Sequence, residues 1–167
     1  MVLIFMGVSG SGKTTLGQLA ARQLDCPFYD GDDFHPEANI RKMSAGEPLS
    51  DADRIPWLLA IREVIERHLD ADTDAVVACS ALREAYREVL SRHDRRVRFV
   101  YLKGSRELLQ ARMQARGGHF MPPALLQSQL DTLEEPAGAL VLDIGQPPEA
   151  LLAQLMDIVQ VRGGLRA

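Results

Sequence analysis

The chain is poor in several features that would each assign it to a class of protein. It has 167 residues and only two cysteines, Cys26 and Cys79, which argues against a disulfide framework and predicts free thiols in a reducing cytoplasm. No apolar run approaches the ~18 residues of a membrane span, and a strand expected from Val2 leaves no room for a leader peptide. Basic residues do not dominate either, because 19 Lys and Arg against 23 Asp and Glu give a net charge of −4. We therefore expect a cytoplasmic protein with neither membrane nor nucleic acid as a partner.

The strongest positive signal is the segment GVSGSGKTT at residues 7–15. An apolar run at residues 2–6 precedes it, so a buried strand should enter a glycine-rich turn that opens a helix near Lys13. This is the spacing of a phosphate-binding P-loop, in which backbone N–H groups hold phosphates, the lysine reaches the β- and γ-phosphates, and the hydroxyl of Thr14 ligates Mg²⁺. ATP and Mg²⁺ are therefore the predicted cofactors. The residues predicted to contact the nucleotide here are Gly7, Ser9, Gly10, Ser11, Gly12, Lys13, Thr14 and Thr15.

Predicted strands and helices alternate along the rest of the chain. Apolar runs indicate strands at residues 27–29, 75–79, 97–102 and 139–142, and helical spacing indicates helices at residues 55–69, 82–90, 105–116, 125–133 and 147–161. This βαβα order predicts an α/β fold, a three-layer doubly wound parallel sheet in a single domain over residues 1–167. Residues 31–53 and 117–123 are interpreted as an acceptor-binding insertion and a lid.

Other classes of P-loop protein fit the sequence poorly. A switch GTPase needs an NKxD-type motif, and the single asparagine, Asn39, lies in the unrelated segment NIRK. A motor-type ATPase needs a strand that ends in a metal-organising aspartate, and ALVLD at residues 139–143 resembles one. It comes last in the chain, however, so Asp143 is interpreted as a strand-end or cap residue. These points favour a compact small-molecule kinase.

Three longer segments closely resemble the gluconate kinase (gluconokinase) family over nearly the whole chain. HPEAN, KM, PLSDADR, PWL, CSAL and GHF occur in the order expected for that family. The resemblance implies an adenylate-kinase-like core, transfer of the ATP γ-phosphate to the 6-hydroxyl of D-gluconate, and a homodimer. Two positions depart from the family pattern: Arg83 stands where lysine is common, and Gly117 precedes GHF. Arginine keeps the charge but changes the donor geometry.

The residues after the second strand are candidates for activating the acceptor. A loose phosphoryl-transfer transition state needs mainly positioning and charge stabilisation, and a carboxylate can take the proton of the attacking hydroxyl. Asp32 is the preferred base and falls on the position that resembles the family's shared aspartate. Asp30 and Asp33 are rivals, and any of these acids could instead cap the helix that opens near Pro36.

A sugar acid carries a carboxylate and several hydroxyls, which arginine forks and neutral donors recognise. Arg83 and Arg87 lie four apart and would share one helix face, with glutamates as alternative partners. Ser80 could donate to a sugar hydroxyl or cap this helix. His35 could bond a substrate hydroxyl or only its own loop, and His119 is expected to contact the acceptor or a phosphate. The predicted acceptor-binding residues are Asp32, His35, Lys42, Arg54, Ser80, Arg83, Arg87 and His119.

Two arginines before the lid complete the predicted nucleotide site. Arg112 and Arg116 resemble the arginine pair of adenylate-kinase-like lids, where the first lies against adenine and the second meets phosphates, so Arg116 is also a predicted catalytic residue. The alternative role is compensation of a helix dipole. Gln146 and Pro147 are expected to frame the adenine by analogy with that fold.

Two other functions stay open at this point. FYDGD at residues 28–32 also resembles the FxDxD of shikimate kinases, which lack the HPEANIRKM and GHFMPP patterns. A non-catalytic nucleotide-dependent switch is the alternative from another class, although Lys13, Thr14 and Asp32 are all present.

Overall fold

A parallel five-stranded sheet forms the centre of the molecule. The structure is a computed structural model that describes residues 1–115 and 123–163. The strand order is β2-β3-β1-β4-β5, and every neighbouring pair is parallel. The strands are β1 (Val2–Met6), β2 (Phe28–Asp30), β3 (Ala75–Ala78), β4 (Val97–Lys103) and β5 (Leu140–Asp143).

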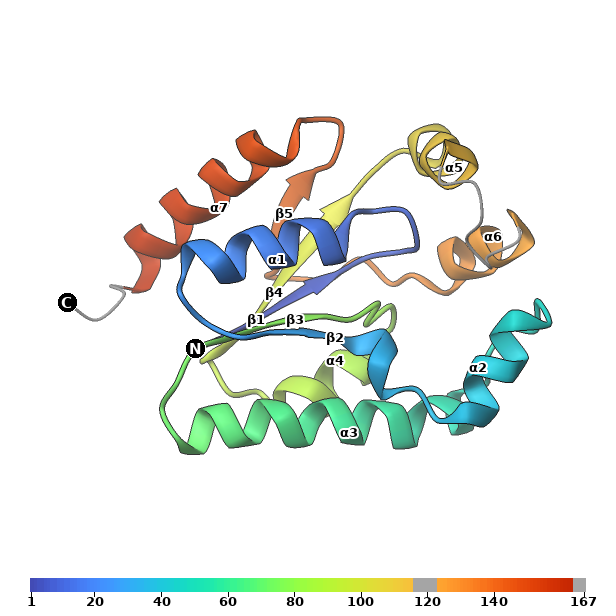
Figure 1. Cartoon of the computed structure of the whole chain (residues 1–167), viewed down its shortest axis with the longest axis horizontal. Coiled ribbons are helices and arrows are strands. Elements are labelled where there is room, and N and C mark those ends of the chain that lie inside the picture. The colour runs from blue at the N-terminus through green and yellow to red at the C-terminus, as the bar shows by residue number, and fades with distance from the viewer. Residues whose placement is uncertain (116–122, 164–167) are drawn as a thin grey trace.

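Helices cover both faces of this sheet, as Figure 1 shows. The helices are α1 (Lys13–Gln23), the 3₁₀ turn η1 (Gly31–Phe34), α2 (Glu37–Ser44), α3 (Asp51–Asp70), α4 (Glu84–Ser91), α5 (Arg106–Ala115), α6 (Pro123–Thr132) and α7 (Pro148–Gly163). Helices α1 and α7 pack on one face, and α3 and α4 pack on the other. The predicted three-layer α/β architecture is therefore confirmed.

The alternation of β1 side chains explains how one strand serves both layers. Leu3 and Phe5 belong to the apolar core under α1 and α7, whereas Val2, Ile4 and Met6 belong to the core under α3 and α4. All five side chains are almost fully buried. Such a continuous apolar run is typical of a strand that is covered on both faces.

The carboxyl ends of the strands place the informative segments together. The P-loop follows β1, the DGD segment follows β2 and the CSAL segment follows β3, and these three strands are neighbours in the sheet. In Figure 1, α2 and α6 lie beyond the same end of the sheet. Ligands of open α/β sheets bind in the crevice at this end.

Two helix boundaries differ from the prediction for local reasons. Helix α3 begins at Asp51, four residues early, because Ser50 and Asp53 form a capping box. Helix α4 begins at Glu84, two residues late, because Arg83 is extended (φ −101°, ψ 151°) and Ala81 has a φ of 43°. Ser80 therefore does not cap this helix, and Arg83 does not share a helical face with Arg87. Within the described residues, no helix is both long and apolar enough to cross a bilayer.

Candidate active site

The P-loop backbone has the conformation that its glycines permit. Gly7, Gly10 and Gly12 have φ angles of 141°, 80° and 93°, a region that side-chain-bearing residues rarely adopt. A Cβ atom on Gly7 would also lie 3.0 Å from the carbonyl oxygen of Leu102. The turn thus depends on glycine both for its dihedral angles and for close approach to β4.

Polar groups of this loop are arranged as expected for a phosphate cradle. Lys13 Nζ donates to the carbonyl oxygen of Val8 at 3.1 Å, which folds the ammonium back over the loop. The Ser11 hydroxyl is buried and has no hydrogen-bond partner within the described part of the chain. The N–H of Ser9 donates to Oε1 of Gln129 on α6 at 2.7 Å. These groups fit a ligand that supplies anionic oxygens.

The two aspartates that flank Gly31 face different neighbours. Thr14 Oγ1 donates to Asp30 Oδ2 at 2.8 Å, and the backbone N–H of Asp32 donates to Asp30 Oδ1 at 3.1 Å. Asp30 is therefore attached to the P-loop helix, while Asp32 lines the pocket described below. Gly31 is required between them, because a Cβ there would lie 2.4 Å from the carbonyl oxygen of Ala78.

A pocket of about 610 Å³ lies between the P-loop, η1, α2, α3 and α6. Its lining joins residues from distant parts of the sequence: Ser9, Lys13, Asp32, His35, Ile40, Met43, Ser44, Glu47, Pro48, Leu49, Arg54, Trp57, Ser80, Leu82, Leu125, Ser128 and Gln129. The predicted acceptor residues Asp32, His35, Arg54 and Ser80 are thus brought together beside the P-loop lysine. The pocket has room for a small metabolite.

His35 is held firmly at the wall of this pocket. Its ring stacks on Trp57 with centroids 4.3 Å apart and an interplanar angle of 12°. Trp57 is 2% exposed, and its Nε1 donates to the carbonyl oxygen of Gly31 at 2.7 Å. Burial, and secondarily the charge of Arg54, lowers the pKa of His35 to about 4. The imidazole is neutral at physiological pH.

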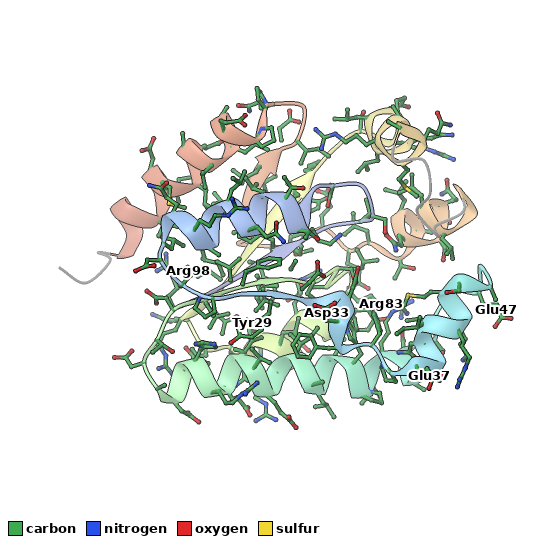
Figure 2. The ribbon with its side chains drawn as sticks, in the orientation of Figure 1. Tyr29, Asp33, Glu37, Glu47, Arg83 and Arg98 are labelled. Carbon is green, nitrogen blue, oxygen red and sulfur yellow. The ribbon has the colours of Figure 1, made fainter. Side chains whose placement is uncertain are left out.

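The predicted cations of the acceptor side have acidic partners within the fold. Arg83 Nη1 donates to Asp51 Oδ2 at 2.8 Å. Arg54 Nη1 lies 3.7 Å from Asp51 Oδ1 and donates to the hydroxyl of Tyr86 at 3.2 Å, and that hydroxyl donates to Asp51. Arg83 and Arg54 therefore converge on one carboxylate. In Figure 2, Arg83 lies at the same end of the molecule as α2, and Arg98 lies at the opposite end.

Lys42 is joined to Asp53 rather than directed at the pocket. Its Nζ lies 2.8 and 2.9 Å from the two carboxylate oxygens. Hydrogen bonds from Lys42, and then from Ser50, hold the pKa of the Asp53 carboxyl below its usual range. Lys42 does not line the pocket, so its position favours a role in fastening α2 to the start of α3.

The placement of Arg87 does not fit its predicted contact with the acceptor. Its side chain is 3% exposed, and Nη1 donates to the carbonyl oxygens of Ala81 and Leu82 at 2.9 and 3.1 Å. The remaining guanidinium nitrogens meet Glu84. Arg87 thus binds the backbone that leads into α4 and pairs with Glu84, one of the glutamates expected as alternative partners.

A second, smaller hollow of about 290 Å³ lies on the far side of the P-loop. Ser11, Gly12 and Thr15 line it together with Arg112, Gln146 and Pro148. Arg112 Nη2 donates to the carbonyl oxygen of Ile144 at 2.7 Å, which orients its planar group beside this space. The predicted proline, Pro147, is not among the lining residues; its neighbour Pro148 is. Asp143 accepts the N–H of Gly145 at 2.9 Å, as expected of a strand-end residue.

Some residues belong to the site without having been singled out from the sequence. Gln129, Asp51 and Tyr86 contact Ser9, Arg83 and Arg54 respectively. Asp51 lies within the PLSDADR segment together with Asp53, and the sequence gives no reason to choose one of these two aspartates over the other. Conversely, Arg116 and His119 lie outside the described residues.

Comparison with known proteins gives the family of the chain. The sequence model of the shikimate kinase family matches residues 9–137. The thermoresistant gluconokinase of Escherichia coli is 39% identical over 163 residues, which covers 95% of this chain and 93% of that protein.

This chain belongs to the gluconokinase family. A gluconokinase structure from Sinorhizobium meliloti 1021 superposes with a TM-score of 0.82 at 43% identity and covers 97% of both chains. An unliganded sugar kinase from Janibacter sp. HTCC2649 superposes with a TM-score of 0.91 at 40% identity over 99% of this chain and 98% of that one. The family predicted from the sequence motifs is therefore confirmed.

Proposed function

We propose that this gluconokinase-family protein transfers the γ-phosphoryl group of ATP to the 6-hydroxyl of D-gluconate, giving 6-phospho-D-gluconate and ADP. The observation that carries the proposal is the pocket of about 610 Å³, which combines Lys13 and Ser9 of the P-loop with Asp32, His35 and Arg54. Phosphate-binding groups and carboxylate- or hydroxyl-binding groups thus face one space. The gluconokinase relatives supply the identity of the acceptor.

The chemistry divides among the residues of this chain as follows. Asp32 accepts the proton of the 6-hydroxyl while the oxygen–phosphorus bond forms and the bond to the β-phosphate oxygen breaks. Lys13 and the P-loop amides stabilise charge on the phosphoryl oxygens, a task that we also assign to Arg116. Arg54, which lines the pocket, binds the acceptor carboxylate, and Arg83, which pairs with Asp51 outside the lining residues, is the second candidate for it. His35 and Ser80 bind the acceptor hydroxyls. Arg112 and Gln146 hold the adenine.

Mg²⁺ fits the donor set, because the exposed Thr14 hydroxyl and the Asp30 carboxylate lie together beside the P-loop. Both offer the hard oxygen atoms that this ion prefers. When bound, Mg²⁺ would neutralise phosphate charge. The family resemblance alone leads us to propose further a homodimer in the cytoplasm.

Identification of the product tests this function. We expect ¹³C and ³¹P NMR of the reaction mixture to show phosphorus bonded through oxygen to C6 of gluconate, with release of one ADP per product. Shikimate in place of gluconate should give no product. Phosphorylation of shikimate, or ATP turnover without a phosphorylated sugar acid, would contradict the proposal.

A further inference from the structure

Asn39 is a buried polar residue beside His35. Asn39 is 3% exposed and lies on α2, four residues beyond His35. Its Nδ2 donates to the carbonyl oxygen of Asp53 at 2.8 Å. A carbonyl oxygen can only accept, so the amide nitrogen of Asn39, and not its oxygen, must face this side.

The same nitrogen fixes the proton on the histidine. Asn39 Nδ2 also lies 3.4 Å from Nδ1 of His35. Since both hydrogens of an amide nitrogen are donors, Nδ1 must act as the acceptor, and two N–H groups would otherwise oppose each other. A neutral imidazole with an unprotonated Nδ1 carries its hydrogen on Nε2.

The free edge of the ring then belongs to the pocket. One face of the imidazole stacks on Trp57, and Nδ1 is engaged by Asn39. His35 lines the pocket, whereas Asn39 does not. Among the described residues no hydrogen bond to Nε2 is present, so this edge is the polar part of His35 that remains for a ligand. The ring is neutral because burial and Arg54 lower its pKa to about 4.

We propose that Asn39 is a positioning residue, which holds His35 as the Nε2–H tautomer so that this nitrogen donates a hydrogen bond to a hydroxyl oxygen of the polyhydroxy acceptor. The proposal rests on the proposed function for the identity of the acceptor, but not for the tautomer. A neutral, single-hydrogen donor selects an oxygen lone pair and adds no charge beside Arg54. Asn39 and Trp57 together specify which edge of the ring the acceptor meets.

The tautomer can be measured without any activity. Long-range ¹H–¹⁵N correlation spectra of the full ¹⁵N-labelled chain at neutral pH distinguish the protonated from the unprotonated ring nitrogen, and loss of the signals in His35→Gln assigns them. We expect Nε2–H and a bare Nδ1. A protonated Nδ1, alone or in an imidazolium, would overturn the proposal. Asn39→Asp, whose carboxylate can only accept, should move the proton to Nδ1.

Kinetics of two replacements at His35 test the donor. Glutamine can place an N–H near the position of Nε2, whereas phenylalanine keeps the stack on Trp57 and has no donor. We expect His35→Phe to raise KM for gluconate by about tenfold, with KM for ATP unchanged, and His35→Gln to recover most of the loss. Equal KM values in the two variants would refute the donor role.

A distant histidine provides the control. His93 has a φ of 60°, which asparagine tolerates, and it does not line the acceptor pocket, so His93→Asn should keep both KM values. If the spectra show Nε2–H but the wild type does not phosphorylate gluconate, the proposed function fails and the tautomer assignment stands. If the wild type phosphorylates gluconate but Nδ1 is protonated, the tautomer assignment fails and the proposed function stands.

Discussion

Asp30 and Asp32 are two residues apart, and their neighbours separate the roles that the sequence left open. Asp30 accepts from the Thr14 hydroxyl, which links it to the phosphate side of the site. Asp32 lines the acceptor pocket with His35 and Arg54. Asp33 is exposed on η1 and does not line that pocket. Asp32 is accordingly the best placed of the three to accept a proton from the acceptor.

Asp32→Asn should therefore lower kcat by ~10²-fold or more, because it keeps the size of the side chain but removes the proton acceptor. KM for ATP should change much less. Asp33→Asn is the matched control and should stay near wild-type activity in the same steady-state assay. A large kcat loss in Asp33→Asn with a small one in Asp32→Asn would show that the base has been assigned to the wrong residue.

The lowered pKa of His35 predicts how the free energy of unfolding depends on pH. Its pKa is about 4 in the folded chain and near the ordinary 6.5 once unfolded. Between these values the unfolded chain binds a proton that the folded chain does not, so the free energy of unfolding falls as the pH drops from 6.5 towards 4. Urea titrations across this range should show a shallower fall in His35→Gln. An unchanged slope would mean that His35 titrates normally in the folded protein.

At the scale of elements, two arginines at the start of α4 have different surroundings. Arg83 is the extended residue before α4, is 41% exposed and meets Asp51. Arg87 is buried inside the first turns and holds the carbonyl oxygens of Ala81 and Leu82. Because Ala81 has a φ of 43°, this stretch depends on added hydrogen bonds for its shape.

Truncation of these two arginines should have different consequences. Arg83→Ala should raise KM for gluconate by roughly tenfold to a hundredfold, since a charge-assisted bond contributes about 1.5–3 kcal/mol, and should leave KM for ATP nearly unchanged. Arg87→Ala should instead destabilise the fold by about 1–3 kcal/mol, because buried carbonyl groups lose their donor. Thermal unfolding and steady-state kinetics of both variants decide this. An unchanged melting temperature in Arg87→Ala would contradict its structural role.

Local patterns were sufficient to predict the elements but not all of their partners. The apolar run at residues 2–6 and the P-loop spacing predict β1, the phosphate cradle and the parallel order of strands and helices. Four of the predicted acceptor residues, Asp32, His35, Arg54 and Ser80, line one pocket. That they bind the acceptor stays a prediction. Arg87 was not predictable, since its burial depends on the extended residue Arg83 and the left-handed Ala81 that delay α4.

Tertiary pairing explains the remaining difference between sequence and structure. Asp51 accepts hydrogen bonds from Arg83 and Tyr86, which are 32 and 35 residues away, and Gln129 reaches Ser9 across 120 residues. No helical or strand spacing connects such residues. The ion pair of Lys42 is likewise not evident from the sequence, because its partner Asp53 lies in the capping box of another helix.

At the scale of the whole molecule, a net-acidic chain gathers Lys13, Arg54 and Arg83 at one end of its sheet. This arrangement suits two anionic substrates, a nucleoside triphosphate and a carboxylate-bearing acceptor. A site whose arginine binds the acceptor carboxylate discriminates against the neutral analogue, because the analogue cannot form that charge-assisted hydrogen bond.

The ratio of kcat/KM for D-gluconate to that for sorbitol tests the central claim most directly. The two molecules have similar lengths and hydroxyl chains and differ in the carboxylate. In one coupled ADP-release assay, we predict that gluconate is preferred by roughly tenfold to a hundredfold, the value of one charge-assisted hydrogen bond, and that Arg83→Ala reduces this preference. Equal kcat/KM values for gluconate and sorbitol in the wild type would contradict a sugar-acid kinase.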